Sequence, residues 1–254
     1  MTEVKIKKEH GTKLKDGAAG LLSTGIWIII SFAAANAVLL GNLAPFGAAA
    51  VAAARRKDAM GAAVGAIMGY IFSMSTGNNI RYIASVLVVL GLKLVLERFA
   101  EGDFVSVLMA AAGTGLSSFG YAAMTSISGY GSGLALAETA VAAGSAYFFK
   151  RTSTALEHGK SLAVLSGGDR ACALMTAAIA AASLTPVTVG GLSIGGIAAA
   201  FAVLIAAGYG RESGGAVAGV ATGTAVALSG NMLAETLSGY ALGGLVAGIF
   251  AVFG

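Results

Sequence analysis

Two carboxylates stand inside long apolar runs, each in the same four-residue context. Glu138 lies in Leu-Ala-Glu-Thr at residues 136–139, and Glu235 lies in Leu-Ala-Glu-Thr at residues 233–236. A charged side chain in hydrocarbon is costly, so acidic residues there indicate proton coupling, an ion path or a polar contact between helices. Each glutamate also lies about one turn from an expected outer helix end, where water can solvate it. A single repeated tetrapeptide is too short to establish an inverted repeat.

The sequence carries no other pattern typical of a catalytic or metal site. His10 and His158 lie far apart in polar segments, and Cys172 is the single cysteine of the chain. Neither a zinc site nor an internal disulfide is therefore expected. No Gly-rich phosphate loop ending in Lys and Ser or Thr occurs, and no nucleophile motif is recognisable. We expect no catalytic, cofactor-binding or metal-binding residue in this chain.

The composition sets the surroundings in which the carboxylates must be held. Hydrophobic residues make up 57% of the 254 residues and charged residues only 11%, whereas a soluble domain carries about 25% charged residues. Apolar runs recur from residue 18 to the C-terminus, and in lipid such runs must form helices or a closed barrel. Their length and their lack of alternation favour helices. The predicted fold is an all-α transmembrane bundle of about ten helices.

Lysine and arginine clusters predict which side of the membrane each loop faces, because such residues stay on the cytoplasmic side. Five lysines precede the first apolar run. The topology determinants further along the chain are Arg55, Arg56, Lys57, Lys150 and Arg151. An even number of crossings then places both termini in the cytoplasm. The N-terminal cluster has no aromatic residues among its lysines, so nucleic-acid binding is not expected.

Polar interruptions divide the chain into four parts. These are a basic cytoplasmic tail at 1–17, a first half of membrane helices at 18–149, a polar cytoplasmic connector at 150–170, and a second half of membrane helices at 171–254. In the second half, Arg211 and Glu212 predict a charged corner between two helices, and the charge rule places it in the cytoplasm.

The segment at residues 43–54 decides the direction of every later helix. It is too short for a full upright span, because the hydrocarbon core requires about 20 residues. The Arg-Arg-Lys-Asp run at 55–58 follows it at once and is strongly cytoplasmic in character. We interpret the segment as a short or thinned crossing. A re-entrant segment is the alternative, and it would invert every later helix.

Glycines are frequent and fall inside the expected helices. The chain has 38 of them, against a usual frequency of about 7%. Two sets recur at four-residue spacing, which gives a helix a face that another backbone can approach closely. The sets are Gly61, Gly65 and Gly69, and Gly215, Gly219 and Gly223. Packing within the bundle is the favoured interpretation, and a seam between two copies of the chain is the alternative.

Several motifs, in their order along the chain, resemble the membrane region of the stage II sporulation protein E family. The run Leu-Leu-Gly-Asn-Leu-Ala-Pro-Phe-Gly at 39–47, followed by Arg-Arg-Lys-Asp at 55–58, resembles its first helical hairpin. Residues 162–170, 214–220 and 237–245 are similar to its second half. The resemblance covers nearly the whole chain, and its specificity lies in the order of the motifs and in the Pro-Phe-Gly corner.

This resemblance implies a role that the residues alone do not indicate. Complete members of the family carry a cytoplasmic regulatory region and a manganese-dependent PP2C-type serine/threonine phosphatase after the membrane domain. The phosphatase dephosphorylates an anti-sigma factor antagonist, which releases a forespore-specific sigma factor, and it associates with the division machinery at the polar septum. No segment here matches the motifs of its metal-binding aspartates. Manganese is therefore implied only for the absent phosphatase region, and enzymatic activity of this chain is left open.

Three interpretations of function follow. The first is a domain that anchors, targets and oligomerises a sporulation phosphatase in the bacterial cell membrane, at the polar septum. Its expected partners are the lipid bilayer, further copies of the chain, cell-division proteins and a phosphatase domain in the same polypeptide. The alternative is a small-molecule or ion transporter or channel that uses Glu138 and Glu235. The third is a scaffold with neither a transported ligand nor an attached enzyme.

Overall fold

Helices dominate the structure, which is a computed structural model. It describes residues 20–39, 43–73, 76–98, 102–125, 129–157, 165–229 and 233–251. The strands in these ranges are β1 (Thr188–Val189) and β2 (Leu192–Ser193), which form one short antiparallel hairpin. The predicted all-α class is therefore confirmed. The predicted basic tail at 1–17 lies outside the described residues.

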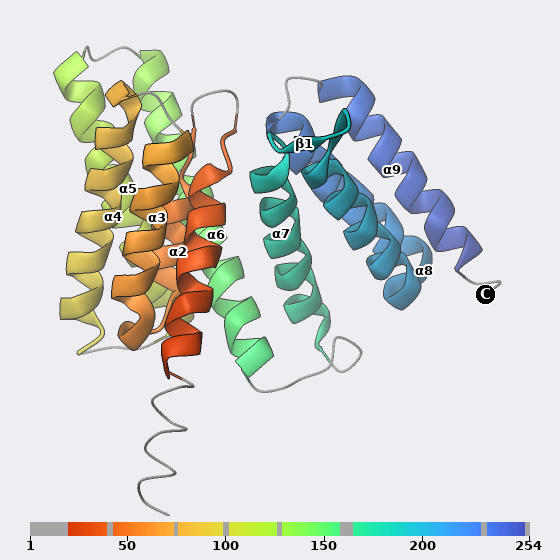
Figure 1. Cartoon of the computed structure of the whole chain (residues 1–254), viewed down its shortest axis with the longest axis horizontal. Helices are drawn as coiled ribbons and strands as arrows, with labels where there is room; N and C mark the ends of the chain where they lie inside the picture. The colour runs from red at the N-terminus through yellow and green to blue at the C-terminus, as the bar shows by residue number, and fades with distance from the viewer. Residues whose placement is uncertain are drawn as a thin grey trace, which may run out of the picture.

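The helices form two groups along the chain (Figure 1). The first group consists of a helix at Gly20–Asn36, then α2 (Phe46–Ala53), a 3-10 turn η1 (Arg56–Asp58), α3 (Ala59–Ser73), α4 (Thr76–Leu96), α5 (Asp103–Thr125) and α6 (Gly129–Glu157). The second group consists of α7 (Gly167–Leu184), α8 (Ile194–Ser229) and α9 (Leu233–Phe250). Because α6 extends to Glu157, the beginning of the predicted connector at 150–170 is helical, whereas residues 158–164 lie outside the described ranges.

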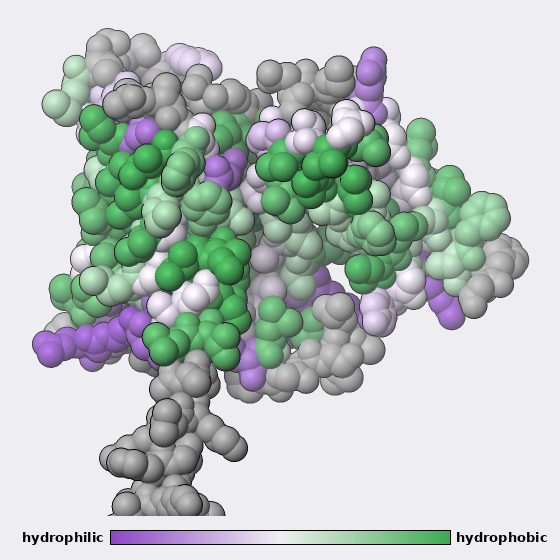
Figure 2. All heavy atoms as spheres, in the orientation of Figure 1, coloured by the Kyte–Doolittle hydropathy of each residue, from purple (hydrophilic) through white to green (hydrophobic). Residues whose placement is uncertain are grey.

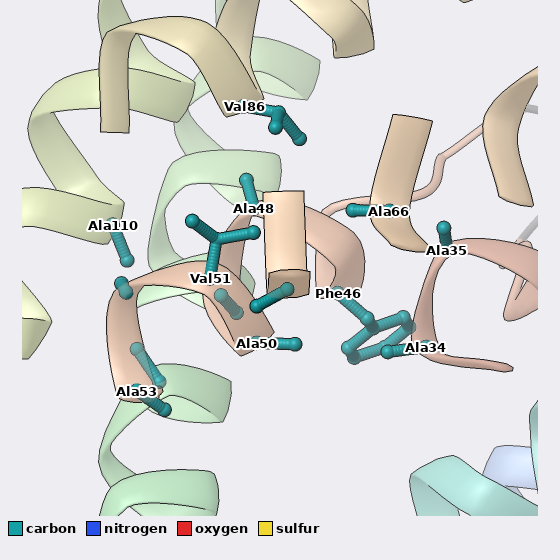
Figure 3. Packing of buried hydrophobic residues seen from close by; sticks show 14 of the residues in the cluster. Ala34, Ala35, Phe46, Ala48, Ala50, Val51, Ala53, Ala66, Val86 and Ala110 are labelled. Carbon is teal, nitrogen blue, oxygen red and sulfur yellow. The ribbon is translucent and has the colours of Figure 1, made fainter. Parts of the chain in front are cut away.

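Helix α2 forms the centre of the first group. All eight of its residues are buried, and α3, α4, α5 and α6 contact it. Figure 3 shows Ala48 and Val51 of α2 among side chains such as Val86 of α4 and Ala110 of α5. The alanine-rich sequence of α2 explains this position, because small side chains let four helices approach a single short one.

The glycines of α3 show in which direction this helix runs. A Cβ atom on Gly61 would meet Thr24, one on Gly65 would meet the backbone of Ile28, and one on Gly69 would meet Phe32 and Ala35 of the first helix. Increasing residue numbers in α3 thus match increasing numbers in the first helix, so the two helices are parallel. The chain between them must return along the bundle. The predicted short crossing agrees with this path, whereas a re-entrant segment would leave α3 antiparallel to the first helix.

The second group contains a sharp reversal inside α8. Arg211 has a non-helical backbone, with φ 53° and ψ −140°, and it divides α8 into arms at 194–210 and 212–229. The predicted charged corner is confirmed at this position. The second arm packs antiparallel on α9, because a Cβ atom on Gly215 would meet Gly244, and one on Gly219 would meet Tyr240.

The surface of the helices suits a membrane. Large apolar side chains such as Ile29, Phe72, Leu136 and Phe201 are exposed, and Figure 2 shows hydrophobic residues over the flanks of the bundle. By length and composition, three described helical segments could each cross a bilayer, namely Asn79–Leu96, Asp103–Met124 and Ile194–Ser229, although the last reverses at its centre. The predicted count of about ten crossings stays a prediction.

Candidate functional site

Glu138 is the centre of a buried polar network that joins three helices. Only 1% of this residue is exposed. Its Oε1 atom accepts a hydrogen bond of 2.5 Å from the Tyr82 hydroxyl of α4 and lies 3.6 Å from the Arg81 guanidinium. Its Oε2 atom accepts a 2.7 Å hydrogen bond from Ser118 of α5. Both carboxylate oxygens are therefore satisfied by neighbouring helices, as a buried acidic group requires.

Arg81 supplies the positive charge of this network. Its side chain is 11% exposed, and its guanidinium lies 4.5 Å from the ring centre of Tyr82 and 5.3 Å from that of Tyr121. Aromatic faces attract a guanidinium, most strongly where water is excluded. Sequence reasoning missed Arg81, although a single arginine at the start of an apolar run was a signal that a buried acid needed a partner.

Tyr70 and Tyr82 connect the network to the irregular backbone before α2. The Tyr70 hydroxyl donates to the carbonyl oxygen of Ala44 at 2.7 Å, and the Ala44 N–H donates to the Tyr82 hydroxyl at 3.1 Å. The two rings are stacked, with their centres 5.2 Å apart. Non-helical backbone at membrane depth is tolerated only where protein groups satisfy it. These tyrosines therefore hold the Pro-Phe-Gly corner in place.

Lys93 holds the other end of α2. Its side chain is fully buried, and Nζ donates to the carbonyl oxygen of Ala52 at 2.8 Å and to Glu97 at 2.6 Å. The last carbonyl groups of a helix lack partners within the helix and carry a partial negative charge, so a cation there is favourable. Both ends of the short central helix are thus bound by buried polar side chains.

Asp58 forms a second buried cluster, at the turn between α2 and α3. Its carboxylate accepts hydrogen bonds of 2.9 Å from both Ser23 and Thr24 of the first helix and one of 3.1 Å from Arg55. Burial alone would raise the pKa of Asp58, but these three donors and the charge of Arg55 together lower it below its usual value of 3.8. Arg55 also lies 3.4 Å from Glu157 at the end of α6.

We expect Asp58→Asn to lower the free energy of unfolding by about 2 kcal/mol at neutral pH, because charge-assisted hydrogen bonds are lost. The pKa of Asp58 is lower in the folded protein than in the unfolded chain, so the ionised carboxylate stabilises the fold. This stabilisation is present above the unfolded pKa of about 4 and is lost as the pH falls through the folded pKa, where the carboxylate takes up a proton. Thermal unfolding of the purified chain at several pH values measures both effects. The more exposed Asp103, 3.8 Å from Arg151, provides the control, and Asp103→Asn should change stability by less than about 1 kcal/mol. Equal losses for the two variants would contradict the assigned role of Asp58.

The other predicted topology determinants lie near the same end of the bundle. Arg56 and Lys57 of η1 are exposed, and Lys150, near the end of α6, is half-buried. Arg151 donates a 2.7 Å hydrogen bond to Asp169 at the start of α7 and so links the two helix groups. The η1 turn, the end of α6 and the start of α7, which carry these residues, lie on the lower side of the structure in Figure 1.

Glu235 has surroundings unlike those of Glu138. It lies in the first turn of α9, is exposed, and lines a groove of about 430 Å³ together with Val203 and Tyr240. Helix α9 packs on α8, whereas Glu138 lies among α4, α5 and α6. Among the described residues, no hydrogen bond or ion pair joins the two glutamates. The shared tetrapeptide therefore does not form one site.

The chemistry of the network is that of a polar helix contact. In the part of the chain that the structure describes, no group of three or more His, Cys, Asp or Glu residues is placed to hold a metal ion. One carboxylate, one guanidinium and several hydroxyls fix the relative positions of α3, α4, α5 and α6 around α2. Hydrogen bonds between helices stabilise such contacts in a membrane, where apolar packing alone is not selective.

The fold and the network define a helical, membrane-associated domain that is held together by buried polar contacts and close packing at glycines. The family model described as SpoIIE, N-terminal domain, matches residues 3–251, which is nearly the whole chain. The chain therefore belongs to the SpoIIE family, as its N-terminal domain, and the resemblance stated from the sequence is confirmed. No curated protein and no solved structure matches the chain.

Proposed function

We propose that this chain is the multi-pass membrane domain that anchors a SpoIIE-type sporulation phosphatase and determines the side of the membrane on which the enzyme lies. The match to the family's N-terminal domain over residues 3–251 is the observation that carries the proposal. In this proposal the chain itself performs no phosphatase chemistry. Manganese belongs to the phosphatase region, which removes phosphate from an anti-sigma factor antagonist and thereby activates a forespore sigma factor.

The path of the helices supports a multi-pass arrangement with both termini in the cytoplasm. In this proposal ten segments cross the membrane in alternating directions, namely the first helix, α2 to α7, the two arms of α8, and α9. Helix α9 therefore runs back toward the side of the bundle on which the first helix begins (Figure 1). That side also carries Arg56, Lys57 and Arg151, and in the sequence the first helix follows the basic N-terminal segment. Because basic loops stay in the cytoplasm, this side is the cytoplasmic one in the proposal.

Targeting and self-association form the second part of the proposal. By family membership, the domain places the phosphatase at the polar septum through contacts with cell-division proteins and with other copies of itself. The faces marked by Gly65 and Gly219 already pack against backbone within the chain. Self-association must therefore use other surfaces of the bundle.

Topology reporters test the arrangement. Reporters fused after Lys57, Arg151 and Gly254 should all give cytoplasmic signals, and one inserted after Gly190, in the turn of the β1–β2 hairpin, should give an external signal. The re-entrant alternative predicts external signals at Arg151 and Gly254. Such signals would overturn the proposed orientation and leave the family assignment unchanged.

The transporter alternative has less support. Glu138 has partners on both carboxylate oxygens, and Glu235 is exposed in another helix group. Coupled transport would predict that Glu138→Gln abolishes an ion or solute flux in vesicles that contain the chain. The anchoring proposal predicts no flux above that of empty vesicles, with or without this substitution.

A further inference from the structure

The start of α3 and the end of α4 meet at a basic corner of the first helix group, which Arg56, Lys57 and Arg98 form. Arg56 and Lys57 belong to η1, directly before α3, and Arg98 follows the last residues of α4. All three are exposed. The Arg56 guanidinium donates a 3.4 Å hydrogen bond to the carbonyl oxygen of Leu94, which lies about one helical turn before Arg98. The two arginines are therefore neighbours, although 42 residues of sequence separate them.

The carboxylates described near the basic corner are engaged by other cations. Asp58 accepts a hydrogen bond from Arg55, and Glu97 accepts one from Lys93. Glu157 lies 3.4 Å from Arg55. In the part of the chain that the structure describes, no ion pair joins a carboxylate to the three cations of the basic corner. The carbonyl group that Arg56 binds has no net charge and uses one of its five N–H donors, so the corner retains an excess of positive charge.

Exposed apolar side chains begin directly beside these cations. Met60 and Val64, one turn apart on α3, are 60% and 50% exposed, and Leu94 and Val95 at the end of α4 are 41% and 58% exposed. Gly91, one turn before Val95, has open space over its surface, because an added Cβ atom would meet nothing within 4 Å. Figure 2 shows hydrophilic side chains at the lower left of the molecule, below a hydrophobic flank. Cations followed by an apolar surface match the order of headgroup and acyl chains in a phospholipid.

We propose that the basic corner binds one anionic phospholipid of the cytoplasmic leaflet. Arg56 and Arg98 bind the headgroup phosphate, Lys57 adds positive potential, and an acyl chain lies along Met60 and Leu94. Guanidinium groups form paired hydrogen bonds with phosphate oxygens, and basic residues beside a membrane attract anionic lipids. A zwitterionic lipid leaves the positive charge of the corner unbalanced, and a soluble anion leaves the apolar surface uncovered. The inference rests on the proposed function for its orientation, because the corner must face the cytoplasm.

Native mass spectrometry of the purified full chain tests the site, after incubation with phosphatidylglycerol, phosphatidylcholine or glycerol 3-phosphate. We expect selective retention of one phosphatidylglycerol. Arg56→Gln with Arg98→Gln should reduce that retention about tenfold, because charge-assisted hydrogen bonds are lost. Arg98→Gln alone should reduce it about threefold. The control, Lys150→Gln with Arg211→Gln, removes two cations outside the basic corner and should retain the lipid.

Four results would overturn the inference. These are equal retention of the two lipids, equal retention of glycerol 3-phosphate and phosphatidylglycerol, unchanged retention in the Arg98→Gln variant, and an equal loss in the control variant. Size-exclusion elution identifies a double variant that fails to fold. Arg98→Gln then carries the test, because no hydrogen bond or ion pair within the described residues involves the Arg98 side chain. Cytoplasmic topology signals combined with absent lipid retention would reject this inference alone, whereas an external signal at Gly254 would reject the proposed orientation.

Discussion

Glu138→Ala is expected to lower the free energy of unfolding by about 3–5 kcal/mol, because it leaves the buried Arg81 guanidinium without its counter-charge. The substitution also removes the acceptor for the hydroxyls of Tyr82 and Ser118. Tyr82 binds the backbone of Ala44, so the corner before α2 should loosen as well. Thermal unfolding of the purified chain in detergent micelles, followed by circular dichroism, measures the loss.

A double replacement separates the effect of losing the Arg81–Glu138 ion pair from the effect of losing side-chain volume at these positions. Arg81→Met combined with Glu138→Leu removes both charges and keeps apolar volume, so it should be closer to the wild type than Glu138→Ala is. Glu235→Ala is the matched control, because this glutamate has the same local sequence but is exposed, and it should change stability by less than about 0.5 kcal/mol. A double variant as unstable as Glu138→Ala would show that the ion pair is not the source of the effect.

Gly65→Ala is expected to destabilise the first helix group by about 2–3 kcal/mol, as overpacking does in a closely packed core. A Cβ atom at this position would lie less than 3.0 Å from the carbonyl group of Ile28. That contact is with backbone rather than with a flexible side chain, so α3 and the first helix must separate. Ser23 and Thr24, about one turn before Ile28 in the first helix, donate hydrogen bonds to Asp58. Separation of the two helices should therefore weaken these hydrogen bonds as well.

A glycine in open space provides the control for Gly65. Gly91, inside α4, has no neighbouring atom within 4 Å of an added Cβ atom. Gly91→Ala should therefore leave the unfolding temperature unchanged or raise it, because alanine favours a helix by up to about 1 kcal/mol over glycine. Gly219→Ala repeats the test in the second group, where the Cβ atom would meet the backbone of Tyr240. Equal effects at Gly65 and Gly91 would contradict the packing role.

These expected effects point to a rigid bundle rather than to a mobile one. Buried polar groups bind the backbone at both ends of the central helix α2. The first helix and α3 pack so closely at Gly65 that an added Cβ atom would overlap the backbone of Ile28. The surfaces left for partners are the apolar flanks and the side that carries Arg56 and Lys57.

The sequence by itself determined the class of fold, the close-packing helix faces and the corner at Arg211. For the first, composition indicated a lipid environment, in which a spanning segment must be a helix or part of a closed barrel. The length of the apolar runs and their lack of alternation then favoured helices. Four-residue spacing was sufficient for the second, since Gly61, Gly65 and Gly69 lie on one face whatever packs against them. Charge between two apolar runs predicted the third.

Only the tertiary structure decided which polar residues act together. Glu138 and Glu235 share Leu-Ala-Glu-Thr, yet one is buried and paired and the other is exposed. The difference comes from neighbours that are distant in sequence, because Tyr82 lies 56 residues from Glu138. The same holds for the Asp58 cluster, in which Thr24 lies 34 residues from Asp58. The enclosure of α2 likewise depends on four other helices. Local pattern sets the face of a helix, whereas burial and pairing depend on the helices that the fold brings against that face.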